Sequence, residues 1–244
     1  MTWRRYPGGP GRSYVTTLHC VDVGPSDPRV ARGLLNLAQA GRYLSIARQT
    51  FHRWAKGYGR GKPLLHVKYN GNGLPITFAS LTEAHVLYGL RDAGVRLHKI
   101  RPVLEELKRE FGREYVLLAP ELATDGVDVL WDYSRRTGGD HDLIVGSTGQ
   151  GVFREIVKDY LRYVHREPDG TPEVLELRHG QPSKIIVDVR RSFGQPIFEG
   201  SGVRVVDVAG MLKAGEDPGA VADEFGIGPE DVRTAARILL GHAA

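Results

Sequence analysis

The stretch 37–54, LAQAGRYLSIARQTFHRW, constrains the fold of this chain more than any other segment. Apolar residues recur at helical spacing in both of its halves, and Ser45 falls between them where a tight turn is needed. A helix-turn-helix requires a small residue where its helices cross and an apolar residue on the inner face of the second helix. Gly41 and Phe51 occupy those positions, so the stretch predicts a helix-turn-helix. The alternative is an ordinary antiparallel helix pair with a solvated basic face.

The outer face of the second predicted helix carries residues suited to nucleic acid. Arginine pairs with guanine and glutamine with adenine, while threonine and histidine bind phosphate oxygens. We expect His52 to point outward, because its neighbours Phe51 and Trp54 face inward, although a core histidine is the alternative. The candidate DNA-binding residues in and around this helix are Arg42, Arg48, Gln49, Thr50, His52, Arg53 and Lys56.

The charge of the chain is unevenly distributed. The net charge is only +4, but residues 1–62 hold 11 Lys and Arg against two Asp, a balance of +9. Residues 63–184 are close to neutral, and residues 185–244 are acidic. A basic first part argues for a polyanionic partner at that end of the protein. A basic tail that is simply solvated is the alternative, but here the charge coincides with the predicted helix-turn-helix.

Length and composition exclude several classes of protein. With 244 residues, 41% of them hydrophobic, the chain can form two or three modest domains. No apolar run approaches a membrane span, and the first residues lack the apolar core of a signal peptide, so we expect a cytoplasmic protein. Cys20 is the only cysteine, which excludes an internal disulfide and a cysteine-rich zinc site.

Two extended segments follow the helix-turn-helix. Residues 64–69 and 74–78 flank the sequence NGNG, a strong hairpin signal because Asn and Gly accept positive φ. Such a hairpin would form a wing and would add Lys68, Asn70 and Asn72 to the DNA-binding candidates. Residues 80–83, SLTE, form a capping box that predicts a helix ending near Gly94.

A further helix is expected to end at Gly112. Its apolar stripe is a candidate dimer interface or plain core, and consists of Leu97, Ile100, Val103, Leu104, Leu107 and Phe111. The order of helix, turn, helix, hairpin and two helices in residues 35–112 resembles the winged-helix domains of the MerR superfamily. The resemblance implies that the second helix enters the major groove while the wing touches the flanking backbone. We therefore expect a basic arm over residues 1–30, a DNA-binding domain over 31–114 and a homodimer, since operators are usually pseudo-palindromic.

Residues 115–184 predict a small mixed α/β module. Strands are expected at 127–133 and 143–145, a helix at 152–164, a turn at 167–170 and an extended segment at 174–178. Three acids, Asp125, Asp128 and Asp132, could be imagined as a metal site, and His141 with Asp142 as a base and its orienter. The glycine-rich residues 146–151 could cradle an anion. None of these matches a ligand or nucleotide-binding motif, so we expect no metal, no cofactor and no catalytic residue.

Residues 185–244 predict an extended segment, glycine-rich reversals and three helices. The helices are expected from 205 to 213, from Pro218 after an Asp217 cap, and from Pro229 to near Gly241. Small and apolar residues here repeat the spacing of the first helix-turn-helix. The last helix, however, opens with Glu230 and Asp231, which would face phosphates with negative charge. It is therefore expected to be a poor DNA reader.

The run IIVDVRRSFGQPIFEGSGVRV at 185–205, followed by three helices, is similar to a small bacterial trihelical domain of unassigned biochemical function that recurs in VapB-type antitoxins. The chain departs from the usual pattern at Val189, where proline is common, and at Ser201-Gly202, where a threonine usually stands. The predicted fold class is mainly α with small β elements (α+β), with this domain spanning residues 185–244.

Together the two domains resemble a VapB-type type II antitoxin, which implies binding and no catalysis. Such proteins hold a toxin inactive and repress their own operon, and the VapB type partners a PIN-domain ribonuclease whose acidic site binds a divalent metal. Antitoxins commonly place Arg or Lys among those acids. Arg190, Arg191 and Arg204 are the toxin-binding candidates that the resemblance implies. The alternative is a stand-alone MerR-type regulator whose middle module senses a ligand.

Overall fold

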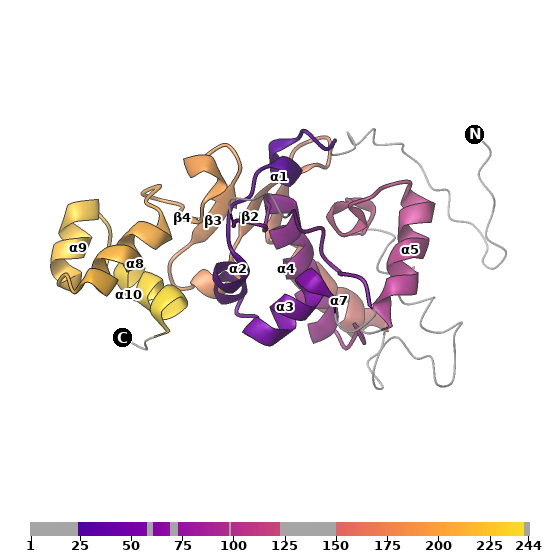
Figure 1. The fold of residues 1–244 in the computed structure, drawn as a ribbon, viewed down its shortest axis with the longest axis horizontal. Helices are drawn as coiled ribbons and strands as arrows, with labels where there is room; N and C mark the ends of the chain where they lie inside the picture. Colours follow the sequence, from indigo (N-terminus) through magenta and orange to yellow (C-terminus); the bar gives the residue numbers. More distant parts are fainter. Residues whose placement is uncertain (1–23, 58–60, 69–72, 98, 123–149, 242–244) are drawn as a thin grey trace.

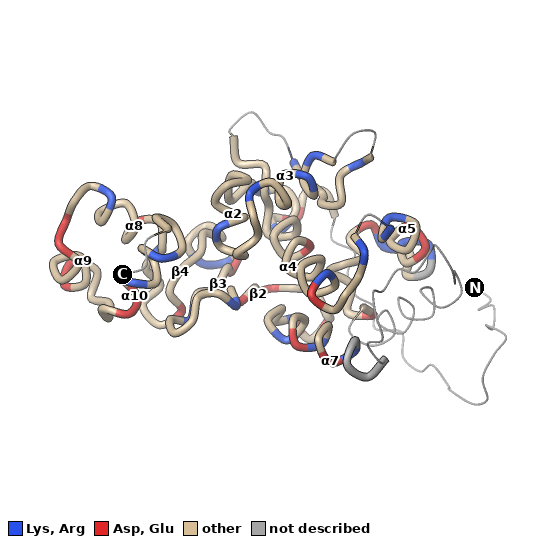
Figure 2. The backbone as a smooth tube through the Cα atoms, turned by 90° about the horizontal axis from the view of Figure 1, so that it is seen from below, with Lys and Arg blue, Asp and Glu red and all other residues tan. Residues whose placement is uncertain are grey.

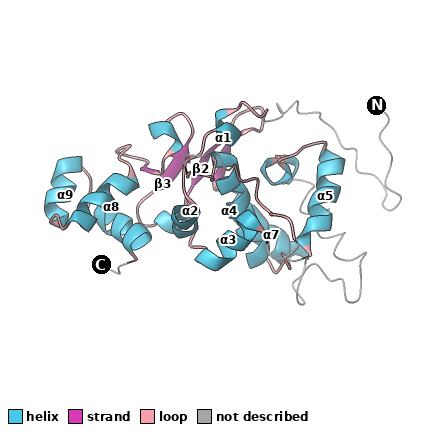
Figure 3. Cartoon of the chain, viewed as in Figure 1, coloured by secondary structure: helices cyan, strands magenta, loops and turns pink. Residues whose placement is uncertain are grey.

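The part of the chain that the structure describes is mainly helical with one small sheet, as the sequence predicted (Figure 3). The computed structural model describes residues 24–57, 61–68, 73–97, 99–122 and 150–241. Helices α8 to α10 lie at one end of an elongated molecule and α5 lies toward the other (Figure 1). The sheet, α2, α3, α4 and α7 lie between them.

The first described element is a short helix that overlaps the end of the range 1–30, which was expected to be an arm. Helix α1 (Pro28–Ala31) is capped by the Asp27 side chain, which accepts from the Arg29 N–H, and has proline at its first position. Arg29 Nη1 also donates to the main-chain oxygen of Pro172 at 3.3 Å. The end of the predicted arm is therefore helical and held against the sheet.

Four helices build the front of the molecule. They are α2 (Leu37–Tyr43), α3 (Arg48–Lys56), α4 (Phe78–Asp92) and α5 (Ile100–Phe111), followed by the 3-10 turn η1 (Val116–Leu118). Helix α5 ends at Gly112, whose φ of 64° is left-handed, as expected of a glycine that stops a helix.

The start of α4 corrects a prediction. The capping box was expected at residues 80–83, but Thr77 is the N-cap, and its side chain accepts from the Ser80 N–H. Phe78 and Ala79 are fully buried, so packing extends the helix back to the earlier cap. Glu83 is consequently free of a capping role and accepts hydrogen bonds from His66 instead.

The expected wing is not a regular hairpin in the described residues. Lys68 N–H donates to the Pro75 oxygen at 3.0 Å, but Ile76 pairs with Leu35 in an isolated antiparallel bridge. Pro75 has no N–H to donate, and both main-chain groups of Ile76 are engaged by Leu35, so a ladder with residues 64–68 cannot form. The predicted turn residues 69–72 lie outside the described residues.

The rear half contains the sheet. After α7 (Gln150–Leu161), the strands β1 (Val164–Arg166), β2 (Pro172–Glu176), β3 (Ile185–Asp188) and β4 (Ile197–Phe198) form an antiparallel sheet in sequence order. The turns η3 (Arg178–Gly180) and η4 (Ser192–Gly194) connect its strands. Because β2 pairs with β3, the sheet crosses the predicted domain boundary between residues 184 and 185. The strands predicted at 127–133 and 143–145 lie outside the described part of the chain.

The last helices agree with the sequence-based bounds. They are α8 (Val205–Ala214), α9 (Pro218–Phe225) and α10 (Pro229–Ala235), which continues as the π-helical turn η5 (Ala236–Leu240). The Asp217 side chain accepts from two first-turn N–H groups of α9, as predicted. Gly215 and Gly226 close the first two helices in the left-handed conformation.

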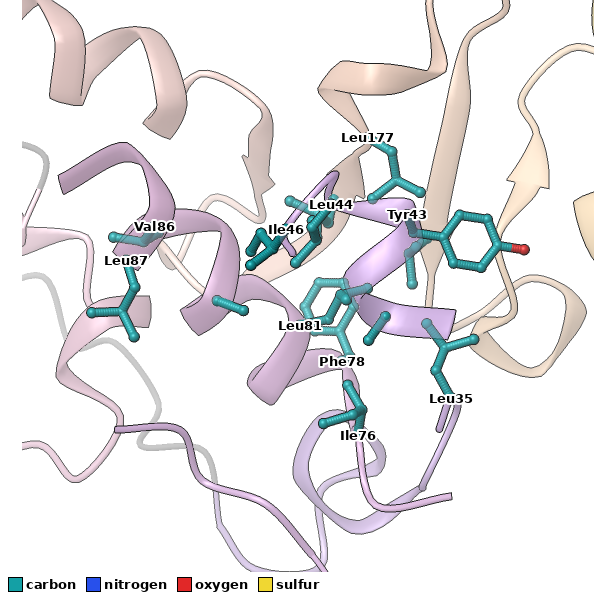
Figure 4. Close-up of a cluster of buried hydrophobic side chains, with 14 of the residues drawn as sticks. Leu35, Tyr43, Leu44, Ile46, Ile76, Phe78, Leu81, Val86, Leu87 and Leu177 are labelled. Carbon is teal, nitrogen blue, oxygen red and sulfur yellow. The ribbon is translucent and has the colours of Figure 1, made fainter. Parts of the chain in front are cut away.

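One contiguous hydrophobic core runs from Val30 to Leu239. Figure 4 shows a part of it, in which Phe78 and Leu81 of α4 lie beside α2 and the Tyr43 ring of α2 points away from them. Of the α5 stripe, Ile100, Val103 and Leu107 are fully buried. Most of the stripe is therefore core within one chain, which leaves a dimer interface unassigned.

Candidate nucleic-acid interface

The crossing of α2 and α3 has the close approach that a helix-turn-helix requires. A Cβ on Gly41 would lie 3.1 Å from the Ile46 carbonyl oxygen and 3.7 Å from the Phe51 Cβ. Ser45 makes the turn with a φ of 53°, and the Phe51 side chain is fully buried beneath it. The roles predicted for the glycine, the serine and the phenylalanine are thus found together at one crossing.

Helix α3 has a buried and an exposed face. Phe51, Trp54 and Ala55 are buried, Thr50 is half-buried, and the exposed side chains are Arg48, Gln49, His52, Arg53 and Lys56. His52 therefore points to solvent, as predicted. The N-cap residue Ala47 has no side-chain hydrogen bond to offer, so it does not offset the positive end of the helix dipole. The exposed face of α3 therefore carries cationic, amide and imidazole side chains, beginning at the first turn of the helix.

Not every predicted DNA-binding residue joins that face. Arg42 on α2 is exposed, but its Nη1 donates to the main-chain oxygen of Leu239 at 2.6 Å, which ties it to the rear helices. Lys68 is exposed beside Pro75 in the segment expected as a wing. Asn70 and Asn72 lie outside the described residues.

A cleft beside α3 adds a residue that the sequence did not indicate. It has a volume of about 290 Å³ and is lined by Thr50, Arg53, Trp54, Arg91, Val95 and Leu97. Arg91 is exposed near the end of α4 and shares this cleft with Arg53 of α3. No spacing in the sequence relates the two arginines, because only the packing of α3 against the end of α4 brings them to one cleft.

The charges separate along the molecule. Figure 2 shows Lys and Arg on and beside α3, whereas Asp and Glu mark α9 at the far end. In the second helix-turn-helix shape, α10 begins with Glu230 and Asp231, and Glu230 pairs with Arg233. The first turn of α10 is acidic where that of α3 is basic, so the starts of the two second helices carry opposite charges.

The three arginines predicted to bind the toxin are exposed, and each has a partner within the chain. Arg190 pairs with Glu167 and Glu173. Arg191 Nη2 donates to the Glu199 oxygen at 3.2 Å, and Arg204 Nε donates to the Asp207 carboxylate at 2.6 Å. The structure thus places them on different local partners around η4 and the start of α8.

The described residues give little support to a metal site or to a membrane-spanning helix. Within the described ranges, no group of three or more His, Cys, Asp or Glu residues is arranged to hold a metal ion. The acids at 125, 128 and 132, the pair His141 and Asp142, and most of the glycine-rich loop at 146–151 lie outside those ranges. No described helix is long and apolar enough to cross a membrane.

Comparisons with known protein families match two separate parts of the chain. Residues 33–104 match the family described as "Putative DNA-binding HTH domain", and residues 185–237 match "Protein of unknown function (DUF433)". The protein is thus a DNA-binding helix-turn-helix protein with a rear domain of unknown function. Both domain types predicted from the sequence are confirmed, while membership of the MerR superfamily stays a prediction.

Full-length relatives narrow the class further. The Mycobacterium tuberculosis protein named "Putative antitoxin VapB45" is 39% identical, over 83% of this chain and 92% of its own length. "Uncharacterized protein Rv2308" of the same organism is 26% identical, over 81% of this chain and 86% of its own. The crystal structure of Rv2018 from M. tuberculosis superposes with a TM-score of 0.68 at 37% identity, over 84% of this chain and 97% of that one. The chain belongs to the VapB45 family of VapB-type antitoxins.

Proposed function

We propose that this protein is the antitoxin of a type II toxin-antitoxin pair, which represses its own operon by binding operator DNA and neutralises a PIN-domain ribonuclease. The observation that carries the DNA-binding part is the exposed polar and basic face of α3, presented by the crossing at Gly41. Family membership supports the antitoxin part over a stand-alone regulator with a ligand-sensing module.

Helix α3 suits the major groove by the order of its side chains. Arg48 and Gln49 stand in the first turn, from which recognition helices contact base edges. Thr50, His52, Arg53 and Lys56 then follow along the helix for phosphate contacts, with Lys68 and the predicted Asn70 and Asn72 from the wing segment. Arg91 supports a further phosphate contact because it shares the cleft with Arg53. We further propose a homodimer that places two α3 helices on the half-sites of a pseudo-palindromic operator.

Electrophoretic mobility shifts on the promoter of the protein's own operon test this proposal. Removing a base-reading arginine costs about 1–3 kcal/mol, so Arg48→Ala should weaken specific binding by about 5- to 150-fold. Lys213→Ala is the matched control, because Lys213 is an exposed cation on α8. Equal affinities for the wild-type protein and both variants would reject α3 as the reader of DNA.

Inhibition of the ribonuclease encoded in the same operon tests the second part. Arg190, Arg191 and Arg204 are exposed cations that could exchange their internal partners for the acids of a metal-dependent nuclease site. Reversing all three charges to glutamate should abolish inhibition, whereas Lys213→Glu should leave it intact. Unchanged inhibition by the triple variant would remove these arginines from the toxin-binding surface.

A further inference from the structure

A single aromatic side chain stands out on the surface of the rear half. Phe193 in η4 is 76% exposed, and among the residues that the structure describes it is the one large hydrophobic side chain left in solvent. Burial of a phenyl ring stabilises a fold, and an exposed ring does not gain this stabilisation. The stability of the isolated chain therefore does not explain why Phe193 is exposed.

The backbone that carries this ring is also unfavourable. Ser192 and Phe193 have φ values of 46° and 58°, in the left-handed region that favours glycine and asparagine. The left-handed conformation costs roughly 1–2 kcal/mol for a residue with a Cβ. Two such residues in succession, the second a bulky aromatic, form the kind of local strain that clusters at functional sites.

The turn is nevertheless held firmly. The N–H groups of Gly194 and Gln195 donate to the oxygens of Arg191 and Ser192 at 2.8 and 3.0 Å. Gln195 Nε2 also donates to the Leu34 oxygen at 2.6 Å, which fixes the turn to the segment just before α2. A ring displayed on a fixed turn loses little conformational freedom when it binds, so the cost of association is low.

A cation lies beside the ring. The Arg32 guanidinium lies 6.0 Å from the centre of the Phe193 ring. The exposed Arg191, which donates to the Glu199 oxygen, comes two residues before Phe193 in the chain. An aromatic centre with an arginine at its edge is the composition of interface hot spots. It calls for an apolar pocket with an acidic rim on the partner.

The surface lies away from α3. Arg32 directly follows α1, and Figure 1 shows α1 and α3 at opposite edges of the molecule. Contact with a partner protein around Phe193 therefore leaves the proposed DNA-reading face open.

We propose that Phe193 is the central anchor of a protein-binding surface formed by Phe193, Arg32 and Arg191, and that its occupant is the toxin, through an apolar pocket rimmed by carboxylates. This proposal rests on the proposed function, because it names the contact by which the antitoxin holds its toxin.

Isothermal titration of the full-length chain with the toxin encoded in the same operon tests the proposal. Phe193→Asn removes the ring but keeps a residue that accepts the left-handed backbone. Hot-spot truncation costs about 2 kcal/mol or more, so the Kd should rise at least about 30-fold. Phe193→Tyr keeps the ring and should stay within a few-fold of the wild-type Kd. Urea unfolding should show Phe193→Asn to be at least as stable as the wild-type protein, which a purely structural role would not allow.

The outcomes separate the two proposals. If the wild-type chain does not bind the toxin, the proposed function fails and this inference fails with it. If the wild-type chain binds and Phe193→Asn binds equally well, only the inference is overturned. It is overturned as well if Phe193→Asn keeps toxin affinity but loses self-association in sedimentation velocity or loses operator binding, since the ring would then serve a second copy or DNA.

Discussion

Arg42 of α2 donates a 2.6 Å hydrogen bond to the main-chain oxygen of Leu239 in η5, and so joins the front helix-turn-helix to the last helical turn of the rear one. The last carbonyls of a helix lack partners within it, and the guanidinium supplies one. Tyr43 is buried beside this contact, and Figure 4 shows its ring directed away from Leu81. Burial raises the pKa of the Tyr43 phenol, and the negative charge of Asp207 raises it further.

We expect Arg42→Ala to lower the free energy of unfolding by about 1.5 kcal/mol, the low end of the range for a hydrogen bond that involves a charged group, because Arg42 is exposed. Urea unfolding measures this change, and Arg42→Lys separates loss of the bond from loss of the charge. Operator affinity should fall less than in Arg48→Ala. If Arg42→Ala keeps full stability and loses as much affinity as Arg48→Ala, Arg42 contacts DNA after all.

Two glycines predict opposite effects of the same substitution. A Cβ on Gly89 of α4 would lie 2.5 Å from Cγ of the buried Tyr160 on α7, so Gly89→Ala must push the helices apart and should destabilise the protein by about 1–3 kcal/mol. A Cβ on Gly210 within α8 would have nothing within 4 Å, so Gly210→Ala should stabilise the protein by about 0.5–1 kcal/mol. Thermal and urea unfolding measure both; equal effects would refute close packing of α4 on α7.

His66 predicts a dependence of stability on pH. Its Nδ1 lies 2.5 Å from Glu83 and its Nε2 2.9 Å from Glu114. Burial would lower the pKa of His66, but these hydrogen bonds and the charge of Glu83 outweigh burial and raise the pKa above 6.5. The stabilisation is therefore complete below pH 6.5 and is lost as the pH rises through the folded-state pKa.

Urea unfolding between about pH 6.5 and about pH 9 should show this loss in the wild-type protein and a flatter profile in His66→Gln. The measurement stays above pH 6.5 because burial lowers the pKa of His85 to about 4. Below pH 6.5, His85 therefore lowers the stability of the folded protein as the pH falls. A wild-type profile no steeper than that of His66→Gln would show that the ion pairs with Glu83 and Glu114 add no stability.

Arg91 predicts a change in the salt dependence of operator binding. If Arg91 meets a phosphate beside Arg53, Arg91→Ala should reduce the slope of log K against log salt by about 0.9, the value for one phosphate contact. The loss of affinity should be similar for operator and unrelated DNA, because phosphates carry no sequence information. Fluorescence anisotropy at several salt concentrations measures both; an unchanged slope would place Arg91 off the DNA.

The sequence predictions were accurate where a feature depends on residues close together in the sequence, and wrong where it depends on residues far apart. Helix ends at Gly112, Gly215 and Asp217 were predictable because caps depend on the few residues around them. The α4 cap was wrong by three residues because two capping sequences competed, and burial of Phe78 chose between them. The wing was expected as a ladder because the hairpin signal of residues 70–73 is local. The backbone pairing of Ile76 with Leu35 joins residues that are far apart in the sequence, so the local signal could not predict it.

By itself the sequence determined the helix-turn-helix, the basic face of α3 and the acidic rear helices, because periodicity, small residues at a crossing and net charge are properties of contiguous residues. The tertiary structure alone decided that Arg42 donates to the Leu239 oxygen and that Arg91 lines the same cleft as Arg53. It also decided that the exposed Phe193 ring lies beside Arg32. Each of these pairs comes from separate elements whose approach is set by packing in the shared core, and no local pattern records that approach.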